Sequence, residues 1–278
     1  MYHGVIVEVH RSGLPHSAES FAMTPREILH LDTRHLGRSL RLYDEVPSTN
    51  DFAASFAHDP DSAGTVFVAE HQTNGRGQYG RLWQARPGSS LLLSILLFPP
   101  AELRRPVLLT AWAAVGIARA ILELTGAEAR IKWPNDLLIG GKKVCGILIE
   151  QSGGVVVGLG LNRSQTAADF AAVGLPDATS LGMVSGTNHD SVTVLKSVIH
   201  HLDDGYDRVL SGDLNTLENR WKQRIGLVGH QVRIDLVDGG HRFGRLRDMS
   251  FDGLEIETGE HAVEAILPEL IRGLSANF

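Results

Sequence analysis

The chain has a single cysteine, Cys145, among its 278 residues, so it cannot form an internal disulfide. Its 13 histidines include no Cys/His cluster with zinc-site spacing, and no structural metal is expected. Long apolar runs are also missing: the longest uncharged one, from Pro106 to Ala118, is too short to cross a bilayer. No basic start followed by an apolar signal segment is present at the N-terminus. We therefore expect a cytoplasmic protein with no membrane partner.

Positive charge is scarce over most of the sequence. The net charge of −6 argues against general affinity for nucleic acid. Residues 1–40 hold four arginines and four acidic residues, and residues 225–278 hold five arginines against nine acidic residues. The segment from Glu70 to Ser90 differs, with three arginines and one acidic residue. We expect no nucleic-acid partner, and positive charge is concentrated in this one segment.

The middle of the chain alternates short β-branched runs with longer runs of helical spacing. The expected strands cover residues 64–70, 90–98, 129–132, 143–151 and 155–161, and the expected helices cover residues 101–124 and 195–210. A hydrophobic content of 43% is sufficient for a sizeable core. Residues 41–224 are therefore predicted to form one domain of the α+β or α/β class with a mixed sheet.

The N-terminal residues 1–40 do not form a clear domain pattern. They contain a short apolar alternation at Val5, Val7 and Val9. Thr24-Pro25 has the composition of a helix start, with threonine as the cap and proline in the first turn. We expect an N-terminal extension here and not a DNA-binding domain, because no pair of helices followed by a hairpin is present.

The C-terminal residues 225–278 have a different sequence pattern, which predicts three short strands. Two turn sequences separate these strands, Asp238-Gly239-Gly240 and Asp252-Gly253. This spacing predicts two tight hairpins within a small β-barrel. A barrel of this size buries little surface alone, so we expect it to pack on the larger domain.

The segment from Gly75 to Arg81 contains three glycines and two arginines in seven positions. Glycine allows backbone N–H groups to turn toward an anion, and arginine binds phosphate or carboxylate through two parallel hydrogen bonds. Alone this loop is a weak signal, since most such loops are ordinary surface turns. Two further segments, 132–136 (Lys-Trp-Pro-Asn-Asp) and 141–147 (Gly-Lys-Lys-Val-Cys-Gly-Ile), add cations about sixty residues later.

In this order and spacing the three segments resemble the catalytic domain of biotin protein ligases. Pro47-Ser48-Thr49-Asn50, residues 69–74 and the strand end Gly158 to Asn162 extend the resemblance, which covers residue 41 to the end. The resemblance implies a catalytic domain like those of class II aminoacyl-tRNA synthetases, followed by an SH3-like barrel. It also implies the reaction: biotin and ATP form biotinyl-5'-AMP with Mg²⁺, and biotin then passes to a lysine of a biotin carboxyl carrier protein. A homodimer is compatible with the family.

The resemblance assigns roles to individual residues. Those implied for biotin are Ser48, Thr49, Asn50, Gln72, Gly75, Arg76, Lys143 and Gly146. Those implied for ATP and the adenylate are Arg76, Gly77, Gln78, Arg81, Trp83, Lys132, Asn135 and Asn162. Those implied for catalysis, as cations that stabilise charge at the α-phosphoryl group, are Arg76, Lys143 and Lys132.

Several of these residues also have a structural interpretation. Ser48 or Thr49 could cap the helix that follows, and Lys132 could be a solvated lysine at a strand end. Trp83 either covers adenine or packs the end of the loop. Asp136 either closes a turn with Asn135 or positions Mg²⁺ or the acceptor lysine. Cys145 is expected to be a small buried residue without nucleophilic activity.

The sequence departs from the family pattern at Gln78, because the family loop usually reads Gly-Arg-Gly-Arg. A neutral amide makes a weaker hydrogen bond to an anion than a guanidinium does, so retention of the adenylate is expected to be weaker. Two alternatives to the biotin ligase remain open from the sequence. One is a lipoate or octanoate ligase or transferase of the same superfamily, and the other is a non-catalytic biotin-responsive binding protein.

Overall fold

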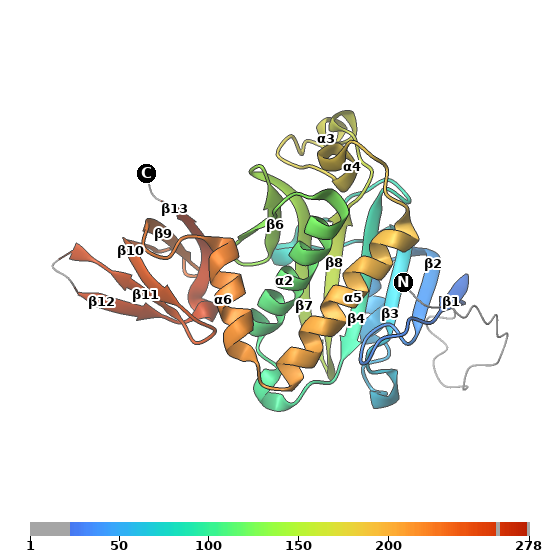
Figure 1. Cartoon of the computed structure of the whole chain (residues 1–278), viewed down its shortest axis with the longest axis horizontal. Helices are drawn as coiled ribbons and strands as arrows, with labels where there is room; N and C mark the ends of the chain where they lie inside the picture. Colours follow the sequence, from blue (N-terminus) through green and yellow to red (C-terminus); the bar gives the residue numbers. More distant parts are fainter. Residues whose placement is uncertain (1–22, 260–261, 277–278) are drawn as a thin grey trace.

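The computed structural model describes residues 23–259 and 262–276 (Figure 1). Eight strands form one mixed sheet, and all of its neighbours are antiparallel except for one parallel pair, the second and third strands. In spatial order the strands are β1 (Glu27–Leu29), β2 (Leu40–Val46), β3 (Val66–Gln72), β4 (Ser90–Leu97), β8 (Gly154–Asn162), β7 (Lys142–Ser152), β6 (Asp136–Ile139) and β5 (Arg130–Lys132). The predicted class, a domain of mixed helices and strands around a mixed sheet, is confirmed.

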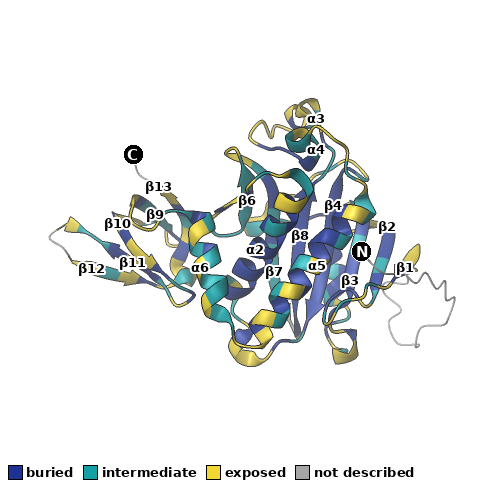
Figure 2. Ribbon diagram, viewed as in Figure 1, coloured by how far each residue is buried: buried dark blue, intermediate teal, exposed yellow. Residues whose placement is uncertain are grey.

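The two faces of this sheet are covered by different elements. On one face lie α2 (Pro106–Thr125), α5 (Ser191–Leu210) and α6 (Leu214–Ile225) (Figure 1). The short helix α1 (Thr49–Ala54) packs on the other face, against β3, β4 and β8. The central strands β4 and β8 are buried along their whole length (Figure 2).

Alternation along β4 decides which side chains reach which face. Leu91, Leu93, Ile95 and Leu97 join the core under α2 and α5, whereas Leu96 joins a second core that includes residues of α1. Ser94 lies on the α1 face, where its hydroxyl contacts that helix. Alternation along the strand therefore places Ser94, a polar residue in the middle of an apolar strand, on the face that carries the polar network described below.

Helix α2 is the central helix of the core. A helix over residues 101–124 was expected, but the structure has a short 3₁₀ turn, η3 (Ala101–Leu103), and a separate α-helix that begins at Pro106. Proline fits the first helical position, where its missing N–H group costs nothing. In the described part of the chain α2 alone is long and apolar enough to span a membrane, yet 72% of its apolar window is buried inside the protein. It is therefore a buried helix of the protein core.

The remaining helical segments are short and lie in the connections. They are η1 (Pro60–Ser62), η2 (Gln78–Gly80), α3 (Ala167–Ala172), α4 (Leu181–Ser185) and η5 (Pro268–Leu270). The expected helix over residues 195–210 is confirmed as part of α5, with Leu195, Val198 and Leu202 buried, although Leu210 at its end is exposed.

The C-terminal strands form a second, five-stranded antiparallel sheet. Its order is β12 (Val263–Ile266), β11 (Leu254–Glu257), β10 (His241–Met249), β9 (Gln231–Leu236) and β13 (Ile271–Ala276). Both predicted hairpins, β9–β10 and β10–β11, are confirmed. The strands β12 and β13 were not anticipated. This sheet is consistent with the SH3-like domain implied by the resemblance.

Aromatic side chains fasten the second sheet to the first domain. The ring of Trp221 on α6 lies 5.7 Å from Trp133 and 5.5 Å from Phe251. Trp133 also donates its indole N–H to the carbonyl of Ile271 on β13, at 3.3 Å. Trp133 therefore fills the space between the two sheets, and the expected packing of the barrel on the larger domain is observed.

The expected helix start at Thr24-Pro25 is wrong. The chain instead enters β1, which pairs with β2 and so extends the large sheet. The loop after β1 is held by Asp203 on α5, whose carboxylate accepts backbone N–H bonds from Arg34, His35 and Leu36, each at 2.8 Å. The alternation at Val5, Val7 and Val9 lies outside the described residues. The proposed domain limits at residues 40 and 224 stay a prediction.

Cys145 is fully buried on β7, and burial raises the pKa of its thiol well above the ordinary value. A raised pKa keeps the thiol protonated, and the protonated form does not react with alkylating reagents. We expect no iodoacetamide adduct on the native protein at about pH 8 and a complete adduct in urea. Mass spectrometry would measure both, and rapid labelling of the native protein would contradict the buried placement.

Candidate active site

Helix α1 begins at the edge of a polar cluster on the α1 face of the large sheet. Ser48 is its N-cap, and the Ser48 hydroxyl accepts a hydrogen bond from the backbone N–H of Asp51 at 3.4 Å. The capping role considered for Ser48 is therefore observed. It fixes the first turn, so that Thr49, Asn50 and Asp51 project toward the sheet.

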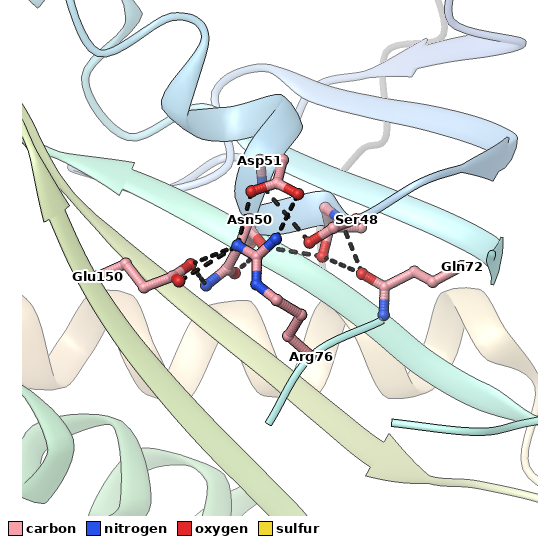
Figure 3. A network of polar contacts seen from close by, with 8 residues as sticks. Ser48, Asn50, Asp51, Gln72, Arg76 and Glu150 are labelled. Atoms are coloured by element: carbon pink, nitrogen blue, oxygen red, sulfur yellow. Dashed lines mark hydrogen bonds and ion pairs between the residues drawn. The ribbon is translucent and has the colours of Figure 1, made fainter. Parts of the chain in front are cut away.

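Thr49 and Asn50 are buried, and both form hydrogen bonds with neighbouring polar side chains. Figure 3 shows Asn50 beside Glu150 and Arg76. Gln72 Oε1 accepts hydrogen bonds from the Thr49 backbone N–H at 2.7 Å and from the Thr49 hydroxyl at 3.0 Å. Ser94 donates to Asn50 Oδ1 at 2.6 Å, and Asn50 Nδ2 donates to Glu150 Oε2 at 2.7 Å. Three strands, β3, β4 and β7, thus hold the start of α1.

Arg76, from the glycine-rich loop, lies between two carboxylates (Figure 3). Its Nη2 donates to Asp51 Oδ1 at 2.6 Å and to Glu150 Oε1 at 3.2 Å, and Nη1 contacts the other oxygen of Asp51. The hydrogen bonds that Arg76 donates to Asp51 raise the pKa of Arg76, with burial opposing them and the charge of Glu150 adding to them. The guanidinium is therefore charged and held in one orientation by a bidentate contact.

The floor beside these groups is formed by glycines of β7 and β8. A Cβ on Gly158 would lie 2.0 Å from Asn50 Oδ1, and a Cβ on Gly160 would lie 2.5 Å from Cε2 of Trp83. A Cβ on Gly146 would lie 3.1 Å from the same indole. The missing side chains thus leave room for Asn50 and for Trp83, which lies flat against the two strands.

Lys143 and Asp136 form an ion pair at the other end of this floor. The distance from Lys143 Nζ to Asp136 Oδ1 is 2.7 Å, and the Asp136 side chain is largely buried. The same ammonium lies 5.7 Å from the ring centroid of Trp83. Lys143 thus bridges the indole and the carboxylate, and Asp136 belongs to β6 and not to the turn that was considered for it.

The loop from Gly75 to Trp83 folds back on itself as a narrow hairpin. Gly77 donates to the carbonyl of Arg81 at 2.7 Å, and Trp83 donates to the carbonyl of Gly75 at 2.9 Å. Gly75 has no room for a side chain, because a Cβ would lie 2.8 Å from the Trp83 carbonyl oxygen. Tyr79, at the tip, has a left-handed φ of 58°, and the guanidinium of Arg272 lies 5.3 Å from its ring centroid. The loop tip thus contacts the C-terminal sheet.

The other predicted site residues differ in their surroundings. Lys132 and Arg81 are exposed, and no side-chain partner is recorded for them or for Gln78 within the described chain. Asn135 donates to the carbonyl of Ile147 at 2.6 Å, which ties β6 to β7. Asn162 is buried and donates to the carbonyl of Thr179 at 3.0 Å. Both asparagines therefore hold backbone in this structure, and their roles toward a nucleotide stay a prediction.

Three residues of the cluster were not predicted: Asp51, Ser94 and Glu150. Asp51 directly follows the Ser-Thr-Asn segment, and Ser94 is the lone polar residue inside an apolar strand. Glu150 shares a strand face with Gly146, four residues earlier, because side chains alternate along β7. These sequence signals are visible afterwards, but none of them indicates that both carboxylates meet Arg76.

Comparison with known proteins assigns this arrangement to a family. Residues 42–162 match the Biotin/lipoate A/B protein ligase family. The bifunctional ligase/repressor BirA of Bacillus subtilis is 31% identical over 237 residues, which cover 83% of this chain and 73% of that protein. The biotin–[acetyl-CoA-carboxylase] ligase of Mycobacterium tuberculosis is 31% identical over 225 residues, covering 78% and 82%.

The chain belongs to the biotin protein ligase family. A solved biotin protein ligase, from Aquifex aeolicus in complex with biotin and ATP, superimposes with a TM-score of 0.73 at 28% identity. The match covers 86% of this chain and 99% of that one. The resemblance of this chain to biotin protein ligases, first seen in the sequence, is thus confirmed. The fold that the resemblance implied is confirmed as well.

Proposed function

We propose that this chain is an ATP-dependent biotin protein ligase that forms biotinyl-5'-AMP and then transfers biotin to a lysine of a biotin carboxyl carrier protein. The named relatives are biotin ligases, and the Aquifex aeolicus structure contains biotin and ATP. In the present structure the supporting observation is the common floor of β7 and β8. Along it lie the polar start of α1, Arg76, Trp83 and Lys143.

Biotin is proposed to lie near Ser48, Thr49, Asn50 and Gln72, whose hydroxyl and amide groups suit a cyclic urea. Two of these, Thr49 and Gln72, already bond to each other, as do Asn50 and Glu150, so their donors and acceptors are held in fixed directions. Fixed groups lose little conformational freedom when a ligand replaces water. The other end of the ligand, its carboxylate, is proposed to face Arg76 and Lys143.

The two cations are proposed to stabilise charge as the biotin carboxylate attacks the α-phosphate of ATP and pyrophosphate leaves. Without cations these two anions would repel each other. Both Arg76 and Lys143 are oriented by internal carboxylates, Asp51 with Glu150 and Asp136 respectively. The acyl adenylate is sensitive to water, and the glycine loop is proposed to close over it. A neutral lysine amine of the carrier then forms the amide and releases AMP.

Mg²⁺ is expected to accompany ATP. The described residues contain no group of three or more His, Cys, Asp or Glu side chains arranged for a metal. Mg²⁺ bound with a nucleotide usually takes only one or two protein carboxylates, the rest being phosphate and water oxygens. Asp136, whose carboxylate pairs with Lys143 on the site floor, would be the protein carboxylate for such an ion. When bound, Mg²⁺ supplies positive charge that offsets the phosphates.

The test is ATP- and Mg²⁺-dependent transfer of labelled biotin to a purified biotin carboxyl carrier domain. Lipoate and octanoate run in parallel, because the family description includes lipoate ligases. Transfer of biotin alone is the expected result. Transfer of lipoate or octanoate alone would make the substrate assignment wrong, and biotin binding without transfer would indicate a binding protein. Light scattering on the same preparation would determine whether the chain forms the homodimer that is compatible with the family.

Replacing Gln78 with arginine is expected to slow release of the adenylate. A charged hydrogen bond typically exceeds a neutral one by about 1 kcal/mol, which corresponds to about a fivefold slower release. Gln78 lies in the loop next to the strained Tyr79, within reach of solvent. Release would be followed by trapping free biotinyl-5'-AMP, with Gln84→Arg, outside the loop, as the control. An unchanged release rate for the Gln78 variant would contradict the expectation.

We also expect no specific operator binding, although the Bacillus subtilis relative is named a ligase/repressor. The basis is charge: residues 1–40 hold four arginines and four acidic residues, and a DNA-binding face requires a surplus of cations. A gel-shift experiment at about 0.15 M salt checks this. A sequence-specific shift that survives competitor DNA would overturn the prediction.

A further inference from the structure

A cavity of about 390 Å³ lies on the helical side of the molecule, away from Arg76. Its lining residues belong to α2, α6 and the segment that leads into β5. The helices α2 and α6 pack side by side (Figure 1). We call this cavity the arginine pocket. Its lining residues are Val115, Arg119, Glu128, Ala129, Arg130, Arg220, Gln223 and Arg224. Because α1 and α2 cover opposite faces of the sheet, the pocket and the candidate active site are separate.

The arginine pocket collects like charges in a protein that is acidic as a whole. Four guanidinium groups and one carboxylate line it, whereas the net charge of the chain is −6. The four arginines come from three separate segments of the chain. Bringing them together costs electrostatic free energy unless an anion lies among them.

The guanidinium groups of the pocket have almost no acceptors of their own. Arg224 donates to the backbone carbonyl of Ala129 at 3.0 Å, and no hydrogen bond or ion pair is recorded for Arg119, Arg130 or Arg220 within the described residues. Elsewhere arginines commonly meet carboxylates, as Arg242 meets Glu264 at 2.9 Å. Most of the guanidinium donors of the pocket therefore have no protein acceptor among the described residues.

The pKa of Arg224 reflects repulsion from the neighbouring arginines. Burial lowers the pKa of its guanidinium, the charge of Glu128 opposes this, and the charges of Arg220 and Arg119 lower it further. Glu128 therefore opposes only part of this effect on Arg224, while a second carboxylate outside the lining, Asp213, interacts with the charge of Arg220. An anion in the cavity would stabilise the charged form of every guanidinium that it contacts.

We propose that the arginine pocket binds a small anion carrying two or more phosphate groups. Guanidinium forks pair with phosphate oxygens through two parallel bonds, and two phosphate groups offer one pair of terminal oxygens to each of Arg119, Arg130 and Arg220. A volume of about 390 Å³ lies in the range of small-molecule sites. Arg130 begins β5, which ends at Lys132, and Arg220 and Arg224 belong to the helix that leads to the C-terminal sheet. A bound anion would therefore tie these two parts together.

Titration calorimetry with inorganic pyrophosphate tests this, using the full chain without biotin, ATP or Mg²⁺ at about 0.15 M NaCl. The wild type is expected to bind, and the double variant Arg119→Gln/Arg220→Gln is expected to bind at least about tenfold more weakly. Arg247→Gln removes an exposed arginine on β10 and is expected to change nothing. Inorganic phosphate is expected to bind more weakly than pyrophosphate, and equal affinity would overturn the requirement for two phosphates.

Two further measurements distinguish anion binding at the arginine pocket from two alternatives. One is a purely structural role of its arginines, and the other is anion binding at the candidate active site. The ligand-free double variant is expected to melt at the same temperature as the wild type or higher, because repulsion has been removed. If it fails to fold, Arg119→Lys/Arg220→Lys keeps the charge and is expected to weaken binding by loss of the forks alone. Pyrophosphate affinity that is unchanged in a folded pocket variant, or lost only in Arg76→Gln, would overturn the proposal.

Discussion

Replacing Arg76 with glutamine should lower kcat/KM for biotin transfer by about a hundredfold or more, the usual scale for losing a preorganised group that stabilises developing charge. In the structure Arg76 lies between the carboxylates of Asp51 and Glu150. Without the guanidinium, two negative charges would face each other where two anionic substrates must meet. The variant therefore loses an attractive group and gains a repulsive pair. Steady-state transfer to the carrier domain measures the effect.

The matched control is Arg86→Gln. Arg86 also pairs with a carboxylate, Asp169, but its side chain is 66% exposed and its ion pair involves no residue of the polar cluster. Exposed ion pairs contribute about 0–1 kcal/mol, so this variant should keep normal activity and stability. Arg76→Lys should fall between the wild type and Arg76→Gln, because it keeps the charge and loses the bidentate geometry. Arg76→Gln with more than half of the wild-type activity would refute the role.

A double variant separates stability from catalysis at this site. Arg76→Gln should destabilise the fold by on the order of 1 kcal/mol, a small value because Arg76, Asp51 and Glu150 are all at least about one-third exposed and screened. Adding Glu150→Gln removes the repulsion and should restore part of that stability. It should not restore transfer, since no cation returns. Urea unfolding and transfer assays on the single and double variants complete the cycle.

Replacing Gly158 with alanine should destabilise the fold by about 2 to 4 kcal/mol and abolish the biotin site. The new methyl group would lie 2.0 Å from Oδ1 and 2.9 Å from Nδ2 of Asn50. Asn50 is buried, so it cannot turn away without breaking its bonds to Ser94 and Glu150. Both lost partners would remain buried or constrained, which adds to the cost of overpacking.

Gly259→Ala is the control, because no atom of residues 23–259 or 262–276 lies within 4 Å of its added methyl group and its φ is not left-handed. It should leave the free energy of unfolding unchanged within about 0.5 kcal/mol. Gly158→Ala combined with Asn50→Ala should recover part of the stability, since the clash disappears, while biotin affinity stays low. Equal urea midpoints for Gly158→Ala and the wild type would show that the contact with Asn50 is not as close as the structure has it.

The elements with strong local signals were predictable from the sequence. The apolar strands β4 and β8, the amphipathic helix α5 and the two C-terminal hairpins follow from periodicity and turn residues alone. The helix start predicted at Thr24-Pro25 was wrong, because the pairing of β1 with β2 overrides a weak capping signal. The last strands β12 and β13 are short and half exposed, so their own sequence carries little pattern, and neighbouring strands decide them.

The sequence by itself determined the chemistry available to this protein: a glycine loop with arginines, a lysine beside Gly146, and amide and hydroxyl groups before α1. Only the tertiary structure decided which charges meet. Asp51 and Glu150 lie 25 and 74 residues from Arg76, and the four arginines of the pocket are spread from Arg119 to Arg224. Local propensity carries no information about contacts between residues that are so far apart in the sequence. They are fixed when the strands pair in register and the helices pack, because burial of the apolar faces sets the distance between side chains that are remote in sequence.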